Sequence, residues 1–386
     1  MVKGFVDLAD ELQQLKQQNL YRSRRVISSP QGVEITVDGK SVINFSSNDY
    51  LGLANHPEVI ASFKRAVDEY GVGSGSAHLI CGHSYSHHAL EEELAEFTNR
   101  ERVLLFSTGY MANLGVISAL LSRGDQVFQD RLNHASLLDG GLLSGSRFKR
   151  YFHNDLVDLN KKIKPIDGRT LIVTDGVFSM DGDISPLAEL SVLAKEKNAW
   201  LMVDDAHGLG VLGETGAGVL QQQELTQLDV PILMGTLGKG FGTFGAFVAG
   251  SDELIETLIQ KARSYVFTTA LPAAVAEATR TSLKLMIEES WRREKLRTLA
   301  KRFQLGASQL GLSMMSSDSA IQPLLIGDSQ RTVEISEALL SKGFLLSAIR
   351  PPTVPKGEAR LRITFSANHQ QQHVDQLLDA LDEISI

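Results

Sequence analysis

The sequence predicts an α/β protein in which a mostly parallel β-sheet is covered by helices, with a smaller C-terminal α+β domain. Six short apolar runs lie among helical segments in the first two thirds of the chain, and each of the first five is followed by a polar or glycine-rich turn. Such runs are typical of strands that are buried on both faces of a parallel sheet. After about residue 285 this pattern gives way to a charged helix and a shorter mixture of strands and helices.

We therefore predict three regions: an N-terminal helix and hairpin at 1–45, a large α/β domain at 46–285, and an α+β domain at 286–386. The predicted early elements are an amphipathic helix, a hairpin that turns at Asp38-Gly39, and two helices, at 5–25, 32–45, 57–70 and 84–98 in that order. The predicted strands of the large domain are 103–106, 126–129, 171–174, 200–203, 232–235 and 246–249. The predicted elements of the last region are a helix from 291, strands at 321–326, 344–349 and 361–365, a helix at 331–342 and a final helix.

Composition and charge exclude several classes of protein. Of the 386 residues, 43% are hydrophobic and 22% are charged, as in ordinary globular proteins. The net charge of −8 without a basic stripe makes nucleic acid an unsuitable partner. No apolar stretch approaches the roughly 18–20 residues that cross a membrane, and the polar N-terminus gives no export signal. Cys81 is the only cysteine, so we expect no disulfide within the chain and a cytoplasmic location.

The turns that follow the strands hold the candidate functional residues, because ligands bind at the carboxyl ends of strands in such sheets. Lys239 lies in a turn with five glycines between residues 235 and 245. Glycines allow a flat ligand to approach the backbone, and a lysine among apolar walls can act as a nucleophile. The alternative is a solvated lysine on a flexible loop.

Three other turns carry polar side chains with two interpretations each. Asp204 ends a strand and could pair with a cationic ring nitrogen or a metal, with His207 facing the same ligand, or it could cap the next helix. His134 could stack on a flat heterocycle or cap a helix. Ser179 could donate a hydrogen bond to the same ligand or simply occupy a turn. Gly109 lies in the turn after the first strand, just before a helix that we expect to begin at about Met111, where free N–H groups form an anion site.

Two further patterns do not amount to sites by themselves. His83 and His87 are four residues apart, but no third ligand is evident nearby, so we expect no metal. The glycine run at 71–76 has no strand before it, and no glycine-rich turn follows the first strand, which disfavours a nicotinamide-dependent dehydrogenase.

Four segments resemble the α-oxoamine synthases, a branch of the fold-type I enzymes that use pyridoxal 5'-phosphate (PLP). They are NFSSNDYLGL (44–53), TDGVFSMDGD (174–183), VDDAHGLGVLGE (203–214) and GTLGKGFG (235–242). The resemblance extends from about Leu20 to the C-terminal helix. It implies a fold-type I PLP-transferase that works as a homodimer.

The resemblance also implies a role for each candidate residue. Lys239 would hold PLP as a covalent imine, Asp204 would pair with the pyridine nitrogen, and His134 would stack on the ring. For the cofactor, His207 and Ser179 would donate hydrogen bonds to the ring oxygen, and Gly109, Tyr110 and Thr236 would bind the phosphate. For the substrates, Arg362 would bind the amino-acid carboxylate and Asn48 would border the amino-acid site. Arg22 and Thr353 would line the acyl-donor channel.

Within the family, three segments resemble the branch that condenses L-alanine with a pimeloyl thioester, as in biotin biosynthesis. They are 71–97, 320–328 and 348–369, the last of which contains RPPTVPKGEARLR. The thiol carrier would be coenzyme A or acyl carrier protein. The run His78–Gly82 is also similar to a glycine-using branch, so an aminoketobutyrate ligase or aminolevulinate synthase is the alternative. A cofactor-binding protein without catalysis is disfavoured because Lys239, Asp204, His134 and Arg362 are all present.

Overall fold

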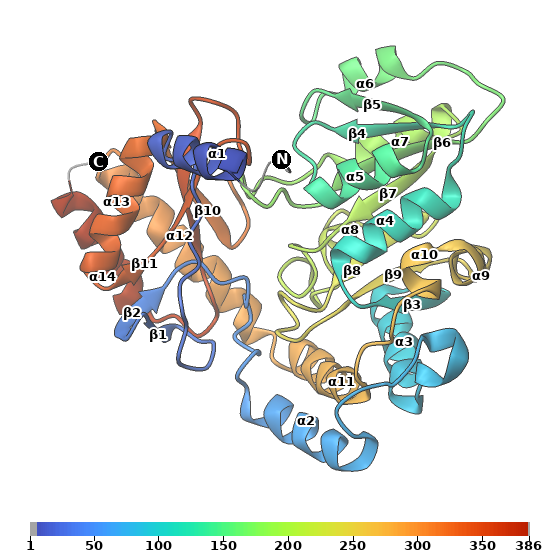
Figure 1. Cartoon of the computed structure of the whole chain (residues 1–386), viewed down its shortest axis with the longest axis horizontal. Coiled ribbons are helices and arrows are strands. Elements are labelled where there is room, and N and C mark those ends of the chain that lie inside the picture. The colour runs from blue at the N-terminus through green and yellow to red at the C-terminus, as the bar shows by residue number, and fades with distance from the viewer. Residues whose placement is uncertain (1–5, 385–386) are drawn as a thin grey trace. The chain divides into compact units, whose positions relative to one another are not determined.

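The computed structural model describes residues 6–384, which form two compact units (Figure 1). The first unit contains the chain up to Ser47, the short segment Met180–Gly182 and the chain from Lys295 onward. The second unit contains Asn48–Ser179 and Asp183–Glu294. The N-terminal segment therefore folds with C-terminal residues, while the predicted boundaries at 45 and 285 stay predictions.

A seven-stranded sheet forms the centre of the second unit, in the order β3-β9-β8-β7-β6-β4-β5. Its strands are β3 (Arg102–Phe106), β4 (Gln126–Asp130), β5 (Arg147–Tyr151), β6 (Thr170–Asp175), β7 (Trp200–Asp204), β8 (Ile232–Thr236) and β9 (Ala246–Gly250). The neighbours from β8 to β5 are parallel, whereas β9 runs antiparallel to both β3 and β8. The prediction of a mostly parallel sheet is confirmed.

Ten α-helices and one π-helical turn of the second unit surround this sheet or extend from it, and α12 continues into the first unit. The ten helices and the turn are α2 (Pro57–Tyr70), η1 (His78–Gly82), α3 (Tyr85–Thr98), α4 (Gly109–Leu120), α5 (Ala135–Leu143), α6 (Leu156–Lys162), α7 (Leu187–Glu196), α8 (Val219–Gln222), α9 (Asp252–Lys261), α10 (Arg263–Val266) and α11 (Ala273–Glu288), and the bounds of α12 are Trp291–Gln309. Val116 and Ile117 of α4 join Val127, Val173 and Met234 of the strands in one buried cluster. Apolar burial of this extent is the main stabilising contribution to such a unit.

All six predicted strands of the large domain are present, and β5 is the strand that the sequence did not reveal. Its residues RFKRY lie at the edge of the sheet, and only Tyr151 is buried. An edge strand needs no continuous apolar run, because one side of it faces solvent. The helices predicted at 57–70 and 84–98 are α2 and α3, and Ser84 serves as the N-cap of α3.

The first unit contains two three-stranded sheets, with orders β1-β2-β11 and β10-β13-β12. The elements are α1 (Val6–Gln17), β1 (Glu34–Val37), β2 (Lys40–Asn44), β10 (Ile321–Gly327), α13 (Ser329–Ser341), β11 (Phe344–Leu345), β12 (Ser347–Ile349), β13 (Ala359–Thr364) and α14 (Gln371–Glu383). The predicted hairpin is β1–β2, with Asp38 and Gly39 both at positive φ in its turn. The single strand predicted at 344–349 is wrong, because Leu346 separates two short strands that pair in different sheets.

The N-terminal helix is shorter than the predicted 5–25. It ends at Gln17, and Asn19 follows with φ 56°, a left-handed conformation that stops a helix. Residue 5 lies outside the described residues. Among residues 6–384, no helix is both long and apolar enough to cross a membrane.

Candidate active site

The carboxyl ends of β4, β6, β7 and β8 lie along one edge of the seven-stranded sheet, which we call the catalytic edge. The register pairs Asp175 with Asp204 and Asp204 with Met234. The turns that follow these strands carry His134, Ser179, His207 and Lys239. The parallel order of the strands thus brings together side chains that are about a hundred residues apart in the sequence.

A chain of hydrogen bonds begins at Lys239. Its Nζ lies 2.8 Å from Nε2 of His207, and Nδ1 of His207 lies 2.7 Å from the hydroxyl of Tyr50. The Tyr50 hydroxyl also donates to Oδ1 of Asn48 at 3.2 Å. His207 and Tyr50 are both buried. The lysine amine is therefore held in place by a histidine whose own ring is fixed from the other side.

A second chain joins Asp204 to His134. Asn113 of α4 donates from Nδ2 to Oδ2 of Asp204 at 2.7 Å and to the hydroxyl of Ser136 at 2.9 Å. That hydroxyl lies 2.7 Å from Nδ1 of His134. The other oxygen of Asp204, Oδ1, accepts the N–H of Ala206 at 3.0 Å. Asp204 is 3% exposed, so these donors stabilise a carboxylate that is removed from water.

The charges at the catalytic edge act on one another. Burial lowers the pKa of His134, while Asp204 acts to raise it and Lys239 to lower it. Burial and the nearby Asp204 raise the pKa of Asp175 well above its usual value. Asp175 also accepts the backbone N–H of His134 at 2.7 Å, which fixes the start of that turn. Groups with shifted pKa values around a lysine and an aspartate are typical of an active site.

Of the two roles considered from the sequence for His134, the structure shows the helix cap, and stacking on a flat ligand stays a prediction. His134 is the N-cap of α5, and its Nδ1 accepts the N–H of Ser136 at 3.3 Å. The ring packs edge-on against Tyr110, with 6.5 Å between the ring centroids. Capping fixes the ring without occupying its faces, so a flat ligand can still stack on it.

The predicted phosphate-binding residues lie at the start of α4 and the end of β8. Gly109 and Tyr110 begin α4, which Thr108 caps by accepting the N–H of Met111 at 3.2 Å. First-turn N–H groups have no partner within a helix and favour an anion. Thr236 ends β8, and its hydroxyl donates to Gly245 at 3.1 Å. Tyr110 donates a hydrogen bond to Asp139, and this bond raises the pKa of Tyr110.

Ser179 lies half-buried in the turn after β6, and a histidine connects this turn to the one that carries His134. His153 lies 3.1 Å from Asp130 at the end of β4 and 2.8 Å from Asp183 in the Ser179 turn. Burial acts to lower the pKa of His153, but the hydrogen bonds and charges of the two carboxylates outweigh it and raise the pKa to about 10, so His153 remains a cation at neutral pH. Its ring packs edge-on against Phe178, with centroids 4.4 Å apart. His153 therefore stabilises two turns of the catalytic edge.

The first unit holds the other predicted site residues. Arg22 donates to the hydroxyl of Thr353 at 3.2 Å, so these two residues of the proposed acyl channel do meet. Both line a cavity of about 880 Å³ that Arg24, Arg25 and Arg350 also line. Arg350 has a lowered pKa because of burial and the charge of Arg22.

Arg362 lies on β13 of the same unit, opposite Pro323 and Ser347, and is 5% exposed. Its guanidinium is a rigid fork of donors that suits a carboxylate.

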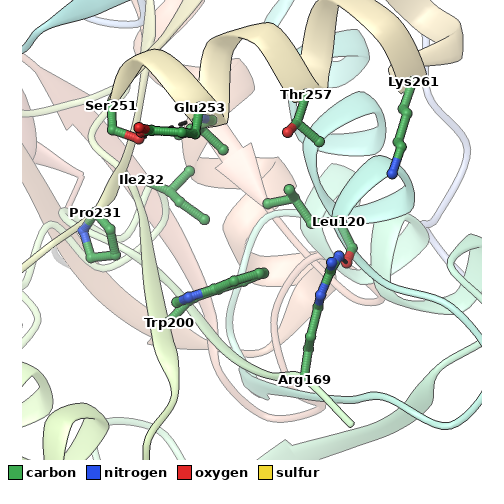
Figure 2. A pocket seen from close by; sticks show the side chains of 10 residues that line it. Leu120, Arg169, Trp200, Pro231, Ile232, Ser251, Glu253, Thr257 and Lys261 are labelled. Carbon is green, nitrogen blue, oxygen red and sulfur yellow. Dashed lines mark hydrogen bonds between the residues drawn. The ribbon is translucent and has the colours of Figure 1, made fainter.

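A different pocket, of about 340 Å³, lies at the amino ends of the strands (Figure 2). Trp200 at the start of β7 and Ile232 at the start of β8 line it. The guanidinium of Arg169 lies 5.3 Å from the Trp200 ring. Its lining contains none of the predicted site residues, and it opens at the edge opposite to the one where ligands bind in such sheets.

Sequence reasoning missed Tyr50, Asn113, Ser136 and His153. Tyr50 lies inside the segment NFSSNDYLGL, and Asn113 lies one helical turn after Gly109, so both were near features already noted. Ser136 and His153 give no signal of their own. They act through hydrogen bonds between turns, and only the folded chain reveals these.

Comparisons with known proteins show which family and which proteins this chain is similar to. Residues 40–381 match the family described as aminotransferase class I and II. The 8-amino-7-oxononanoate synthase of Thioalkalivibrio sulfidiphilus is 61% identical over 378 residues, which cover 97% of this chain and 96% of that protein. The synthase of the same name from Methylococcus capsulatus is 60% identical over 376 residues, 97% of each chain. A structure described as SPT with PLP internal aldimine matches with a TM-score of 0.93 at 32% identity, covering 98% of this chain and 96% of that one.

Proposed function

Because the chain belongs to the aminotransferase class I and II family and acts as a PLP-dependent 8-amino-7-oxononanoate synthase in biotin biosynthesis, we propose that it condenses L-alanine with a pimeloyl thioester. The fold is that of the fold-type I PLP enzymes. The reaction joins the α-carbon of alanine to the acyl carbon and releases the free thiol and carbon dioxide. The enzyme is thus an acyltransferase.

The observation that supports this proposal best is the convergence of Lys239, His207, Asp204 and His134 at the catalytic edge. The side chains come from the ends of three different strands or from the turns that follow them, yet hydrogen bonds or electrostatic coupling relate them. Each type of group has a counterpart on PLP: an amine for the aldehyde, a carboxylate for the pyridine nitrogen, and a ring to stack on.

The residues present fit PLP in their chemistry. Asp204 is a buried carboxylate that already has two donors, and oxygen lone pairs remain for a ring N–H. The first turn of α4 provides N–H donors for a phosphate, and the Thr236 hydroxyl would join them by turning away from the Gly245 carbonyl to which it donates here. When bound, PLP supplies an electron-accepting ring that stabilises negative charge at the α-carbon of an amino acid.

The chain's own residues would move the protons. The amine of Lys239 would remove the α-proton of alanine and later return a proton to the same carbon after carbon dioxide has left. His207 lies 2.8 Å from that amine, and its bond to Tyr50 keeps the ring oriented toward it. Asp204 would hold the cofactor in its electron-accepting form by keeping a positive charge beside it.

Anionic substrate groups would be bound by arginines of the first unit. We assign binding of the alanine carboxylate to Arg362, and we propose that Asn48 borders the amino-acid site. The cavity lined by Arg22, Thr353 and Arg350 suits the acyl donor, because pimeloyl chains and thiol carriers both bear anionic groups that arginines bind well. Ser179 and His207 would donate to the ring oxygen of PLP.

We further propose that two copies form a homodimer and that the enzyme acts in the cytoplasm. The single cysteine fits a reducing compartment. Sedimentation of the purified protein gives the state of association. A mass corresponding to one chain at micromolar concentration contradicts the dimer.

The substrate assignment is tested by product analysis with purified, PLP-loaded protein. L-alanine or glycine is incubated with pimeloyl-CoA or with pimeloyl-acyl carrier protein, and products are measured by mass spectrometry. We expect 8-amino-7-oxononanoate from alanine with one or both carriers. Efficient turnover of glycine with a short acyl-CoA, and none of alanine with either pimeloyl donor, contradicts the proposal.

A further inference from the structure

The segment from His78 to Glu91 contains four histidines and a carboxylate, none of which belongs to the two hydrogen-bond chains described at the catalytic edge. Sequence spacing argued against a metal here, because the pair His83 and His87 lacked a third ligand. In the structure His87 is indeed committed elsewhere. Its Nδ1 accepts the backbone N–H of Ser84 at 2.9 Å, and its Nε2 lies 2.6 Å from the carbonyl oxygen of Leu271.

Three other side chains do converge: His83, His88 and Glu91. Each offers one ligand atom, and the three atoms lie within 4.8 Å of one another. His83 follows η1, whereas His88 and Glu91 are three residues apart on α3 and therefore share one face of that helix. The third ligand that the spacing lacked is Glu91, and the partner histidine is His88.

The distance between two of these atoms leaves room for an ion between them. Nε2 of His83 and Oε2 of Glu91 are 3.9 Å apart, which is too long for a hydrogen bond. Nitrogen and oxygen ligands bind zinc at about 2.0–2.2 Å, so two of them on one tetrahedral ion lie about 3.3–3.5 Å apart. A small rotation of either side chain brings the pair to that separation.

Neighbouring hydrogen bonds orient both ligand atoms. Nδ1 of His83 lies 2.9 Å from Nδ1 of His78, so the opposite ring nitrogen is the one that faces Glu91. Oε1 of Glu91 accepts the N–H of Leu105 at 2.9 Å, so Oε2 is the oxygen that faces His83. Outer hydrogen bonds of this kind hold the ligands of natural metal sites in position.

The exposure of the three side chains leaves a path for an ion. The Glu91 side chain is 14% exposed and that of His83 is 30% exposed, while His88 is 61% exposed and can move. Two imidazoles and one carboxylate favour zinc-class ions over magnesium, which prefers oxygen ligands alone. We propose that His83, His88 and Glu91 bind a divalent transition-metal ion of the zinc class, with water completing its coordination.

Zinc binding to the full-length, PLP-loaded protein tests this proposal by titration calorimetry. We expect one equivalent of Zn²⁺ to bind, and the His83→Gln, His88→Gln and Glu91→Gln variants each to weaken binding at least about tenfold. The glutamine at position 91 keeps an oxygen for the Leu105 N–H, and position 88 is exposed, so we expect these two variants to retain the fold. Magnesium at the same concentration should not compete.

The matched control is Glu92→Gln. Glu92 neighbours the site, is 70% exposed and lies 3.3 Å from His88, but it is not one of the three ligands. We expect this variant to bind zinc like the parent protein. Absence of zinc binding, equal affinity in all variants, or a loss in Glu92→Gln as large as in the ligand variants overturns the proposal. The readout is binding, so its outcome is independent of the proposed reaction.

Discussion

The two units of the chain present their polar residues in different ways. At the catalytic edge of the second unit, Lys239, His207 and Tyr50 are linked by hydrogen bonds of 2.7–2.8 Å, and Asp204 is held by Asn113. In the first unit, arginines line an open cavity of about 880 Å³. A bond-breaking step needs groups fixed at one position, whereas an anion can be bound by several cations around it. We therefore expect substitutions in the second unit to lower kcat and those in the first unit to raise KM.

The largest effect is expected from Lys239→Ala. This change removes both the covalent attachment point and the proposed proton carrier, so kcat should fall by about 10⁴-fold or more, and the visible absorption of the bound cofactor should be lost. Steady-state rates and a spectrum of the purified variant measure both. If the variant retains substantial turnover, Lys239 has no essential role in the mechanism, and the expectation that substitutions at the catalytic edge lower kcat is wrong.

Asp204→Asn is expected to come next. The amide can still accept a hydrogen bond but cannot balance a positive ring, so kcat should fall at least about a hundredfold while some cofactor still binds. The rate of exchange of the alanine α-proton measures this directly.

Asp205→Asn is the matched control, because Asp205 is the adjacent buried acid. Asp205 accepts the N–H of Val219 at 2.7 Å, and burial raises its pKa above the usual value, so we assign it a structural role. Its variant should keep far more activity than Asp204→Asn. Equal losses in the two variants would show that the site responds to any change in this strand.

Arg362→Lys tests whether a substitution in the first unit raises KM. Lysine keeps the charge but loses the two-pronged fork, so KM for alanine should rise about ten- to a hundredfold with a smaller change in kcat. The control is Arg360→Lys on the same strand, since Arg360 is 1% exposed and is paired with Asp181. That variant should lose about 2 kcal/mol of unfolding free energy and show little change in KM. If Arg360→Lys raised KM for alanine and Arg362→Lys lowered only stability, the carboxylate would not bind at Arg362.

The sequence was sufficient for most of the fold, and the exceptions have physical causes. Buried strands such as β6 and β7 are continuous apolar runs, so they could be recognised, whereas the edge strand β5 is rich in charge. The apolar run at 246–249 identified β9 but contains no information about its antiparallel direction. Residues 344–349 read as one strand because the break falls at Leu346, an apolar residue that gives no turn signal.

The residues that meet at the candidate site could be predicted from the sequence, but the hydrogen bonds that join them could not. Asp204, His207 and Lys239 follow strands, and the rule for parallel sheets is enough to bring them to one edge. Tyr50, Asn113 and His153 act by hydrogen bonds that join distant segments, and no spacing in the sequence encodes such bonds. The roles of Arg22, Asn48, Thr353 and Arg362 stay predictions that rest on family resemblance and on the chemistry of their side chains.

The smallest effect is expected from His153→Gln, and it depends on pH. The folded pKa of His153 is about 10, above the ordinary value near 6.5, so its charged form stabilises the fold fully below about pH 6.5 and that contribution is lost as pH rises toward 10. The variant should be about 2 kcal/mol less stable than the parent at pH 6. Denaturant unfolding between pH 6 and 10 should show that difference shrinking. A difference in stability that grows with pH would contradict the inference that charged His153 stabilises the fold through Asp130 and Asp183.

The most direct test of the central claim is reduction of the purified, PLP-loaded protein with borohydride, followed by peptide mapping by mass spectrometry. Reduction makes the carbon–nitrogen bond between cofactor and amine permanent. We predict one labelled peptide, which contains Lys239, and no label in Lys239→Ala. A label on a different lysine, or a cofactor that is released without any label, would contradict the account.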